Sequence, residues 1–468
     1  MTALLDCPTE IMHSILECLP AANLCALCLV SQGLHKVAEP LLYARIELIW
    51  REAQPPPIIS LIQSIQRRPQ LADYIRDLTF HAPFRSYPSG ESVIEDPDGF
   101  HSSHLPPRIS VDSSELGSLI ATIQDIDTPF RDLWIHELRN GTMDAFVMLL
   151  LSLAPILTHL RLTGVFARGN RLLGMMLRAS LCQTSYCKLP RFQYLKEVDF
   201  DPQLDPCRDR RTKNTPDVLP LFYLPVVRSI LVEVDNTGLF AWPTYTSNPS
   251  NLTSLDLRIL REGHLGRILA TTGNLKTLKW QWGYEPNLRN KFNSNVINLD
   301  QIVIDLSLVQ GTLENLHLSG TVHLKHHGYP ALEIKGSLRA LKNFEKLQVF
   351  EVPQLFLIGF SLDDNLGNLE DLMPQNVHHL TINDDIIWVK ENVWQDRDLF
   401  MMLRHWWENL TIYTPSFHSF ELSLLYSDDQ WGFGIRSELT VLCAQLGIRL
   451  EMFKREEDLD QRCNVDKQ

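Results

Sequence analysis

A short apolar pattern recurs along most of this 468-residue chain, and it constrains the fold more than any other feature. In each copy, one apolar residue is followed by a second after three positions and by a third after two more. Strict leucine copies begin at Leu157, Leu252 and Leu313, and looser copies begin at Ile75, Phe130, Leu195, Val227, Leu275, Leu347, Val377 and Phe417. In most copies a polar residue separates the last two apolar positions, which is typical of a β-strand with one buried face.

The flanking residues predict that each copy belongs to a helix–turn–strand unit. Turn residues precede several copies, at Asn251, Asn274 and Asn376, and amphipathic helical stretches precede others, at residues 58–68, 265–270 and 338–344. Stacked units would pair their strands into a parallel sheet and bury their leucines together. The copies start about 34 residues apart on average, which exceeds the roughly 20–29 residues of regular leucine-rich repeats. We therefore expect an irregular α/β solenoid over residues 55–452, and an α/β globular domain of another kind is the alternative.

Two segments interrupt this pattern. Residues 81–114 are rich in Pro, Ser, Gly and acidic side chains, and residues 201–218 are similar, so both are predicted to be inserted loops. Residues 446–452 have the composition of a last strand. The charged and polar residues 453–468 that follow predict a disordered tail.

The first fifty residues show helical spacing instead. Asp6, Pro8 and Glu10 suit a helix start, because an acid meets the positive end of the helix dipole and proline needs no N–H there. We expect a first helix up to Pro20, a second that Asn23 caps, and a third from Ser31 to Pro40. Three short helices are too small to bury all this apolar surface by themselves. Either they pack on the rest of the chain, or they bind a partner.

This N-terminal segment resembles an F-box. The opening of that family, Leu-Pro-x-Glu-Ile followed by Ile-Leu, corresponds to Pro8-Thr9-Glu10-Ile11 and Ile15-Leu16. Its leucine-rich middle and its closing Pro-x-Leu-Tyr correspond to Leu24, Leu27, Leu29, Val30 and Ser31, and to Pro40-Leu41-Leu42-Tyr43. Cys7 stands where the family usually has leucine, which implies weaker packing against the adaptor.

The resemblance implies an F-box over residues 1–48 that docks on a Skp-type adaptor and, through it, on the cullin scaffold of an SCF-type ubiquitin ligase. It implies adaptor contacts at Pro8, Glu10, Ile11, Ile15, Leu16, Leu19, Leu24, Leu27 and Val30. Leu19 and Pro20 close the first helix of the motif.

In general texture, the remaining chain resembles fungal F-box proteins with degenerate leucine-rich repeats, as in residues 222–225 and 249–280. The expected fold class is thus α/β, with a three-helix F-box followed by a leucine-rich-repeat-like α/β solenoid. In such solenoids the polar strand positions line the concave face. Target-binding candidates on that face are Arg161, Asp199, Asp256, Arg258, Lys279, His317, Glu351 and His379.

No catalytic or metal-binding motif stands out. The sequence has no glycine-rich phosphate loop, no G-x-S-x-G elbow and no H-E-x-x-H motif. Cys25 and Cys28 have the spacing of metal ligands, but no second pair accompanies them, and we interpret them as buried core thiols. We expect no enzyme activity, no cofactor and no bound metal.

Composition argues for a protein inside the cell, in the cytoplasm or the nucleus. The net charge of −13 disfavours nucleic acids and anionic membranes as partners. The start of the chain lacks a secretory signal, and its longest apolar stretch, residues 146–154, is far shorter than the ~20 residues of a membrane helix. Nine cysteines, an odd number, fit free thiols in a reducing compartment.

Three functions remain open at this point. The first is a substrate-recognition subunit of a ubiquitin ligase, with an unknown protein target on the repeat surface. The second is a scaffold that binds the adaptor but has no role in ubiquitylation. The third, an enzyme or ligand-binding α/β domain, would need a convergent polar pocket that no motif supplies.

Overall fold

A computed structural model of the chain describes residues 7–51, 54–81, 108–168, 170–183, 188–201, 215–236, 240–284, 293–322, 332–360, 368–387, 396–424 and 433–454. Residues 82–107, 202–214 and 455–468, which contain most of the two expected loops and of the expected tail, lie outside this part. The chain forms two compact units. They comprise Met1–Gln203 with Pro216–Val227, and Leu204–Thr215 with Arg228–Gln468.

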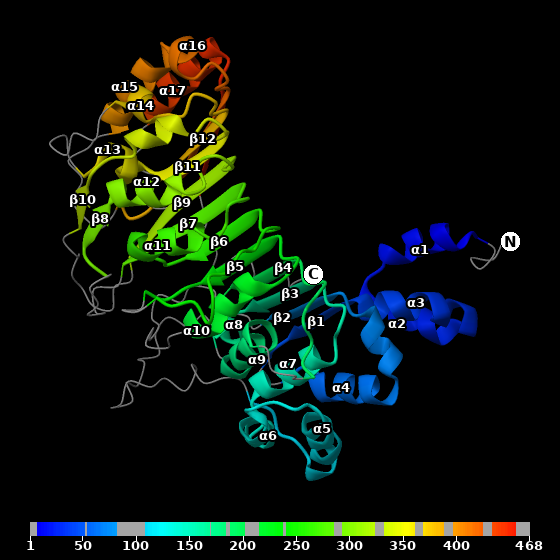
Figure 1. Cartoon of the computed structure of the whole chain (residues 1–468). Coiled ribbons are helices and arrows are strands. Elements are labelled where there is room, and N and C mark those ends of the chain that lie inside the picture. Colours follow the sequence, from blue (N-terminus) through cyan, green and yellow to red (C-terminus); the bar gives the residue numbers. More distant parts are fainter. Residues whose placement is uncertain are drawn as a thin grey trace, which may run out of the picture. The chain divides into compact units, whose positions relative to one another are not determined.

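The first unit contains the N-terminal helices and a set of parallel strands (Figure 1). Its helices are α1 (Thr9–Glu17), α2 (Ala21–Val30), α3 (Gln32–Ala44), α4 (Ile58–Arg67), α5 (Ser113–Asp125), α6 (Arg131–Arg139), α7 (Met143–Ser152), α8 (Val165–Arg168), α9 (Arg171–Cys182) and α10 (Thr215–Val218), with the 3-10 helices η2 (Pro69–Tyr74) and η4 (Leu219–Tyr223). Its strands are β1 (Arg45–Ile49), β2 (Asp77–His81), β3 (His159–Thr163) and β4 (Glu197–Asp201), and they pair in this order.

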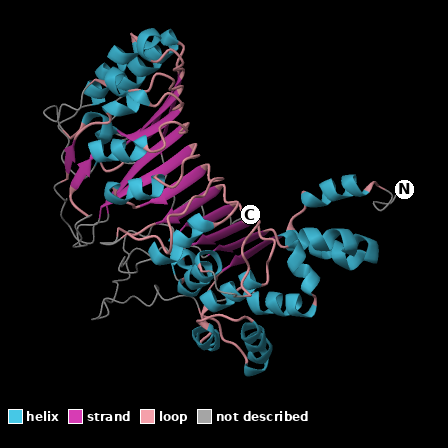
Figure 2. Ribbon diagram, viewed as in Figure 1, coloured by secondary structure: helices cyan, strands magenta, loops and turns pink. Residues whose placement is uncertain are grey.

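The second unit continues the same construction. Its strands are β5 (Ser229–Glu233), β6 (Ser254–Arg258), β7 (Thr277–Tyr284), β8 (Val296–Asn298), β9 (Asn315–Val322), β10 (Glu333–Lys335), β11 (Val349–Pro353), β12 (His379–Asn383), β13 (Ser419–Leu424) and β14 (Arg449–Lys454). Its helices are α11 (Glu262–Leu269), α12 (Leu299–Ser307), α13 (Gln354–Ile358), α14 (Leu369–Leu372), α15 (Asp396–Trp407), α16 (Leu410–Tyr413) and α17 (Phe433–Leu446), with the 3-10 helix η5 (Arg339–Asn343). Figure 2 shows α11, α12 and α13 along one side of the strands of this unit.

The strands of the second unit are parallel and follow one another in sequence order. The pairing runs from β5 through β6, β7, β9, β11, β12 and β13 to β14, while β8 and β10 form a separate pair. Each short connection, which usually contains a helix, carries the chain back to start the next strand beside the last one. The chain is therefore α/β, with N-terminal helices and parallel strands, as the sequence predicted.

The recurring apolar pattern forms these strands, with one exception. In β6, for example, Leu255 and Leu257 are fully buried while Asp256 and Arg258 are half-buried, and the same alternation recurs in β3, β5, β9, β11 and β13. The first apolar residue of each copy, such as Leu252, is also buried just before its strand. The expected last strand is β14, but it begins at Arg449 rather than at Leu446, which ends α17, and it includes Phe453 and Lys454, which were assigned to the tail.

The copy that begins at Phe130 is the exception, because it lies in helix α6 rather than in a strand. The buried residues there are Phe130, Trp134, Ile135 and Leu138, which recur at the spacing of a helix face, whereas Leu133 is only half-buried. An overlapping 3.6-residue period thus overrides the strand pattern at this point. The strand prediction for Phe130 is wrong.

Three details at the N-terminus also differ from the expectation. Helix α2 begins at Ala21, and Asn23 lies inside it rather than capping it. Pro40 does not end the third helix, since α3 continues to Ala44 and loses only the single backbone hydrogen bond that proline cannot donate. Residues 45–49, where the F-box was expected to end, form strand β1 and pair with β2.

The longest apolar stretch of the sequence falls mainly in α7, a core helix of the first unit. Every residue from Met143 to Leu151 is buried. Trp134 of α6 is also buried and donates its indole N–H to the carbonyl oxygen of Ala145 at 3.0 Å. In the part of the chain that the structure describes, no helix combines the length and the apolar character that crossing a membrane requires.

A buried carboxyl group joins α7 to the start of α9. Asp144 accepts hydrogen bonds from the backbone N–H groups of Leu172 and Leu173, at 2.7 and 3.4 Å. These N–H groups belong to the first turn of α9, where they have no partner within the helix. Burial raises the pKa of Asp144 to about 7, although the two backbone donors act in the opposite direction.

Candidate interaction surfaces

Helices α1, α2 and α3 form a small apolar core of their own. Its buried members are Met12, Leu16, Leu24, Leu34 and Ala38. The Ser31 hydroxyl oxygen accepts the backbone N–H of Leu34 at 3.2 Å and so caps α3, which begins where the sequence predicted. This core fixes which residues of the three helices point outward.

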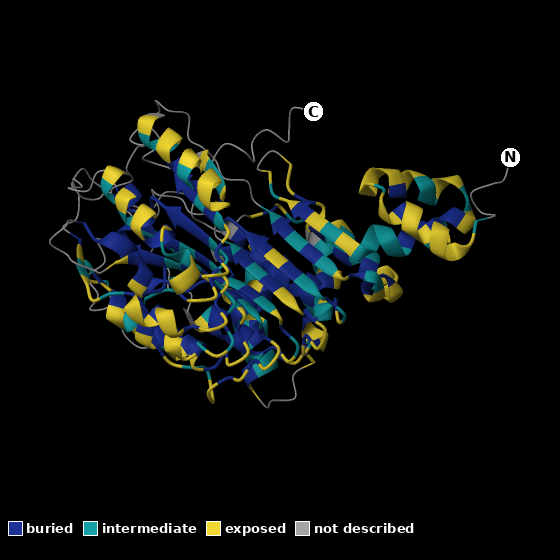
Figure 3. Cartoon of the chain, turned by 90° about the horizontal axis from the view of Figure 1, so that it is seen from above, coloured by how far each residue is buried: buried dark blue, intermediate teal, exposed yellow. Residues whose placement is uncertain are grey.

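Several large apolar side chains remain on the outside of these helices. Ile11 and Ile15 lie one turn apart on α1, with 54% and 45% of their surface exposed. Leu29 and Val30, at the end of α2, are 88% and 68% exposed. Figure 3 shows the exposed stretches along these helices. Apolar groups that stay in water on a short helical module are typical of a surface that a partner covers.

The residues predicted from the sequence to bind the adaptor fall into three groups according to their burial. Pro8, Glu10, Ile11, Ile15 and Val30 are exposed and available to a partner. Leu19 and Leu27 are partly buried and pack against the internal core.

The third group is buried. Leu16 and Leu24 are buried in the internal core, so their side chains support the helices rather than lie on the surface. Leu29 is the most exposed large apolar side chain among the described residues of α1, α2 and α3, and the sequence prediction omitted it. Its position in the leucine-rich middle of the motif, next to Val30, is the sequence feature that indicates it as a contact.

The two cysteines of α2 differ in burial. Cys28 is half-buried and packs against the apolar core, whereas Cys25 is exposed, so the prediction of a buried pair is wrong for Cys25. The reason is geometric: Leu24 occupies the inward face of α2, and its neighbour Cys25 is turned away from it. Among the described residues, no group of three or more His, Cys, Asp or Glu side chains is placed to hold a metal ion.

An ion pair attaches α3 to the segment that follows α4. Two guanidinium nitrogens of Arg68 donate to the two carboxylate oxygens of Glu39, both at 2.7 Å. His35, one turn before Glu39 on α3, lies 3.2 Å from the same carboxylate. Hydrogen bonding from Arg68 lowers the pKa of Glu39, against the opposing effect of burial. This bidentate contact fixes the base of the helical module.

The N-terminal helices lie within a match to a known protein family. Residues 4–49 match the F-box-like family model. These residues are called the F-box segment below, and the match supports an F-box protein. The match covers α1, α2 and α3 together with strand β1. No curated protein matches the chain.

A second candidate surface lies on the polar face of the strands. Within each unit, the polar positions of neighbouring strands lie side by side, since the strands pair in register. In the first unit Arg161 is paired with Asp199, and their side chains form an ion pair of 2.8 Å. All eight nominated target-binding residues belong to strands, and the register brings them together within each unit: Arg161 and Asp199 in one, and Asp256, Arg258, Lys279, His317, Glu351 and His379 in the other.

Many polar side chains on this face already form hydrogen bonds or ion pairs with one another. His317 Nδ1 lies 2.9 Å from Glu351 Oε2, and Glu351 Oε1 also accepts the Asn383 amide at 3.3 Å. His379 makes hydrogen bonds of 2.9 Å with the hydroxyls of Ser419 and Thr381. Such networks hold the side chains in fixed positions, and a partner has to match them rather than rearrange them.

Proposed function

We propose that this chain is a substrate-recognition subunit of an SCF-type ubiquitin ligase. The F-box segment binds a Skp-type adaptor that is attached to a cullin scaffold, and the α/β remainder binds a target protein. The F-box-like match carries this proposal, together with the exposed apolar side chains of Ile11, Ile15, Leu29 and Val30 in the same segment. An apolar surface of this kind fits a protein interface with a desolvated centre.

The chain itself performs no chemistry in this proposal. It acts inside the cell by holding a target close to the ubiquitin-charged enzyme that the cullin recruits. Two binding surfaces on one chain raise the effective concentration of target lysines near the reactive thioester. The rate enhancement then comes from proximity and orientation rather than from residues of this chain.

The burial of each residue refines the proposed adaptor contacts. Direct contacts come from the exposed members Pro8, Glu10, Ile11, Ile15 and Val30, to which we add Leu29. Leu19 and Leu27 contribute their partly exposed edges. Leu16 and Leu24 act indirectly, by holding α1 and α2 in position.

The proposed target surface is the polar face of a leucine-rich-repeat-like solenoid. Support comes from the parallel strands in sequence order and from the helices along one side of them. Arg161, Asp199, Asp256, Arg258, Lys279, His317, Glu351 and His379 remain the candidate contacts on that face.

A capture experiment with matched variants tests the adaptor contact. In Ile11→Asp/Ile15→Asp, two charges replace apolar side chains that lie one turn apart and are half-exposed. The control is Ile304→Asp/Leu308→Asp, which changes two apolar residues of the same spacing, 60% and 51% exposed, at α12 in the second unit. We expect the first variant to bind the Skp-type adaptor at least about a hundredfold more weakly, and the control to bind like wild type.

The outcomes separate the proposed function from its alternative. Equal adaptor binding by wild type and Ile11→Asp/Ile15→Asp, with both folded by circular dichroism, would contradict docking through α1. If the adaptor and the cullin co-purify with the chain but no associated protein is ubiquitylated in a reconstituted reaction, the scaffold function replaces the ligase function.

A further inference from the structure

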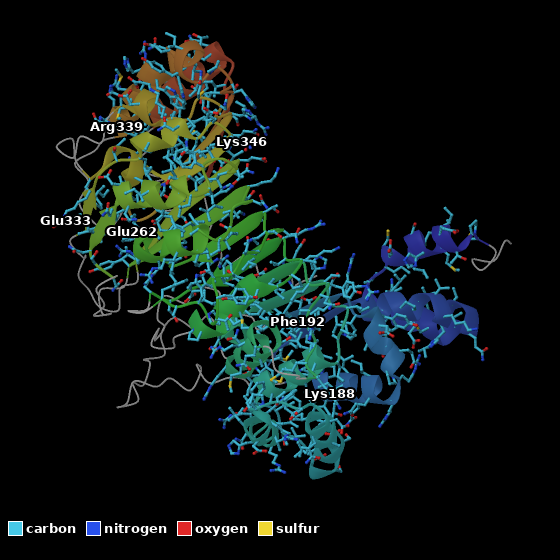
Figure 4. All side chains as sticks on the ribbon, in the orientation of Figure 1. Lys188, Phe192, Glu262, Glu333, Arg339 and Lys346 are labelled. Carbon is cyan, nitrogen blue, oxygen red and sulfur yellow. The ribbon has the colours of Figure 1, made fainter. Side chains whose placement is uncertain are left out.

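A polar groove of about 520 Å³ lies in the second unit, where the chain enters successive strands. It is formed by residues just before strands β5, β6, β7 and β9 and by a loop residue before β11. Arg228, Thr253, Lys276 and Glu314 each immediately precede a strand, and Lys346 lies three residues before β11. Figure 4 labels Lys346 on one side of this unit and Glu333 on the other.

The backbone holds these side chains in a row. Thr253 donates its N–H to the carbonyl of Arg228 at 3.0 Å, Lys276 donates to Thr253 at 2.9 Å, and Glu314 donates to Lys276 at 2.8 Å. Neighbouring parallel strands are about 4.8 Å apart, so the backbones of Arg228 and Lys276 are about 10 Å apart. The Asn274 amide also donates to the carbonyl of Ser250 at 2.7 Å, which joins successive turns of the groove wall. The groove is thus a rigid feature of the strand register.

The groove is positively charged within an acidic protein. Its charged lining consists of Arg228, Lys276, Lys346 and one carboxylate, Glu314, against a net charge of −13 for the chain. Glu314 is already engaged by Lys276 at 2.8 Å. Arg228 and Lys346 are exposed, and within the described residues neither makes an ion pair. These two cations are therefore free to meet a negative partner.

We propose that this groove binds an acidic, extended segment of the target protein. Arg228 and Lys346 precede β5 and β11, which are four strand spacings, or about 19 Å, apart. This distance corresponds to about six residues of an extended peptide, so carboxylates six positions apart can reach both cations. Ser250, Thr253 and Asn274 add hydroxyl and amide groups that suit a peptide backbone. The lining contains no aromatic side chain on which a nucleic-acid base could stack, which favours a peptide.

This inference rests on the proposed function, because it names the class of target and a second surface for it beside the strand face. Long-range attraction between opposite charges speeds encounter and selects the partner, while the rigid row of side chains sets the register. Affinity at such an exposed site is sensitive to salt, since opposite charges are screened within about 10 Å at 0.1 M ionic strength.

The test uses the full chain and a labelled, capped peptide of about eight residues with glutamate at every third position, in fluorescence anisotropy at low salt. Comparison peptides carry glutamine, or phosphoserine, in place of glutamate, and a short single-stranded oligonucleotide serves as a further probe. The groove variant is Arg228→Glu/Lys346→Glu. The charge-matched control is Arg339→Glu/Lys335→Glu, at exposed residues of η5 and β10 that do not line the groove. We expect the glutamate peptide to bind about tenfold more weakly or worse to the groove variant, and within about twofold of wild type to the control.

Several results would overturn the inference. They are no binding of the glutamate peptide by wild type, equal binding of the glutamine peptide, and an equal loss in both variants. Binding of the phosphoserine peptide or the oligonucleotide alone would assign the groove to a different ligand. Adaptor capture measured on the same preparations keeps the two proposals apart, because peptide binding without adaptor capture contradicts only the F-box proposal.

Discussion

The F-box segment and the strands of the second unit differ in how far their apolar side chains are buried. In β6, β9 and β11, Leu255, Leu316 and Phe350 are fully buried, and polar residues face outward between buried neighbours. In α1 and α2, Ile11 and Leu29 are more exposed than buried. The strands bury their apolar residues within the unit, whereas the helices leave part of theirs in water.

The difference follows from size and stacking. Three helices of 9, 10 and 13 residues enclose only a small core, because a short module has little interior for its surface. Each inner strand of the second unit, by contrast, has a strand on both sides, so its apolar residues pack beside those of the neighbouring strands. One region buries its apolar side chains by itself and exposes polar groups; the other leaves an apolar surface that the proposed adaptor would cover.

The largest effect is expected for the free energy of unfolding when a buried leucine is replaced by alanine, and two such leucines, one in each region, can be compared. Leu316→Ala removes a fully buried side chain from β9, between β7 and β11, and should lower the free energy of unfolding by about 4 kcal/mol. Leu16→Ala opens a smaller core that can collapse more easily, and should cost about 2 kcal/mol. Urea unfolding, with hydrogen exchange resolved by segment, measures both values.

Adding the adaptor should affect the two variants differently. A ligand that binds only the folded F-box segment stabilises that segment by mass action, so it should restore protection to Leu16→Ala. It should leave the strand region of Leu316→Ala unchanged. If the adaptor restores both variants, or neither, the two regions do not differ in the way described.

The second prediction concerns pH, to which α7 and α9 of the first unit should respond in the opposite direction from the F-box segment. The folded-state pKa of Asp144 is raised from 3.8 to about 7, so the folded protein binds a proton that the unfolded chain has released. Its contribution to stability is therefore greatest at low pH and declines as pH rises from about 4 to 7. Between pH 5 and 7 the loss is about 2 kcal/mol. Asp217 and Asp305, with pKa values raised to about 6, act in the same direction.

Glu39 in the F-box segment has the opposite sign. Its pKa is lowered by Arg68, so the ion pair stabilises α3 at neutral pH and is lost as pH falls through the folded-state pKa. Hydrogen exchange at pH 5 and pH 7 should show α7 and α9 better protected at pH 5, and no such gain in α3. Asp144→Asn should remove most of the slope in α7 and α9, since Asn keeps an oxygen acceptor for Leu172. A slope that survives in that variant would assign it to other groups.

The sequence predicted the strands better than the surfaces. A strand copy such as Leu313-Leu316-Leu318 carries its own period, so most copies were placed without any knowledge of their neighbours. The copy at Phe130 failed because Trp134 and Leu138 add a helical period over the same residues. Strand β1 was missed because its pairing with β2 depends on residues some thirty positions away.

The candidate surfaces depend still more on tertiary structure. Leu16 and Leu29 are both leucines of the motif, yet one is in the core and the other is almost fully exposed. Only the packing of three helices distinguishes them. Likewise, Arg228 and Lys346 are far apart in sequence and precede their strands at irregular intervals, so only the strand register brings them to one groove.

The smallest effect is expected when a helix-capping residue is replaced by alanine, and each region has one such residue. The Ser31 hydroxyl accepts the N–H of Leu34 at the start of α3, and the Asn298 side chain accepts the N–H of Gln301 at the start of α12, at 3.2 and 3.1 Å. Replacing either with alanine should cost about 1 kcal/mol. If the F-box segment is only marginally folded without its adaptor, Ser31→Ala should also weaken adaptor binding by up to about fivefold, because binding must then supply that free energy. Asn298→Ala should leave adaptor binding unchanged. Titration of the adaptor against both variants decides this: unchanged affinity in Ser31→Ala would mean that α1–α3 are stably folded alone and that the adaptor covers their apolar surface without completing their fold.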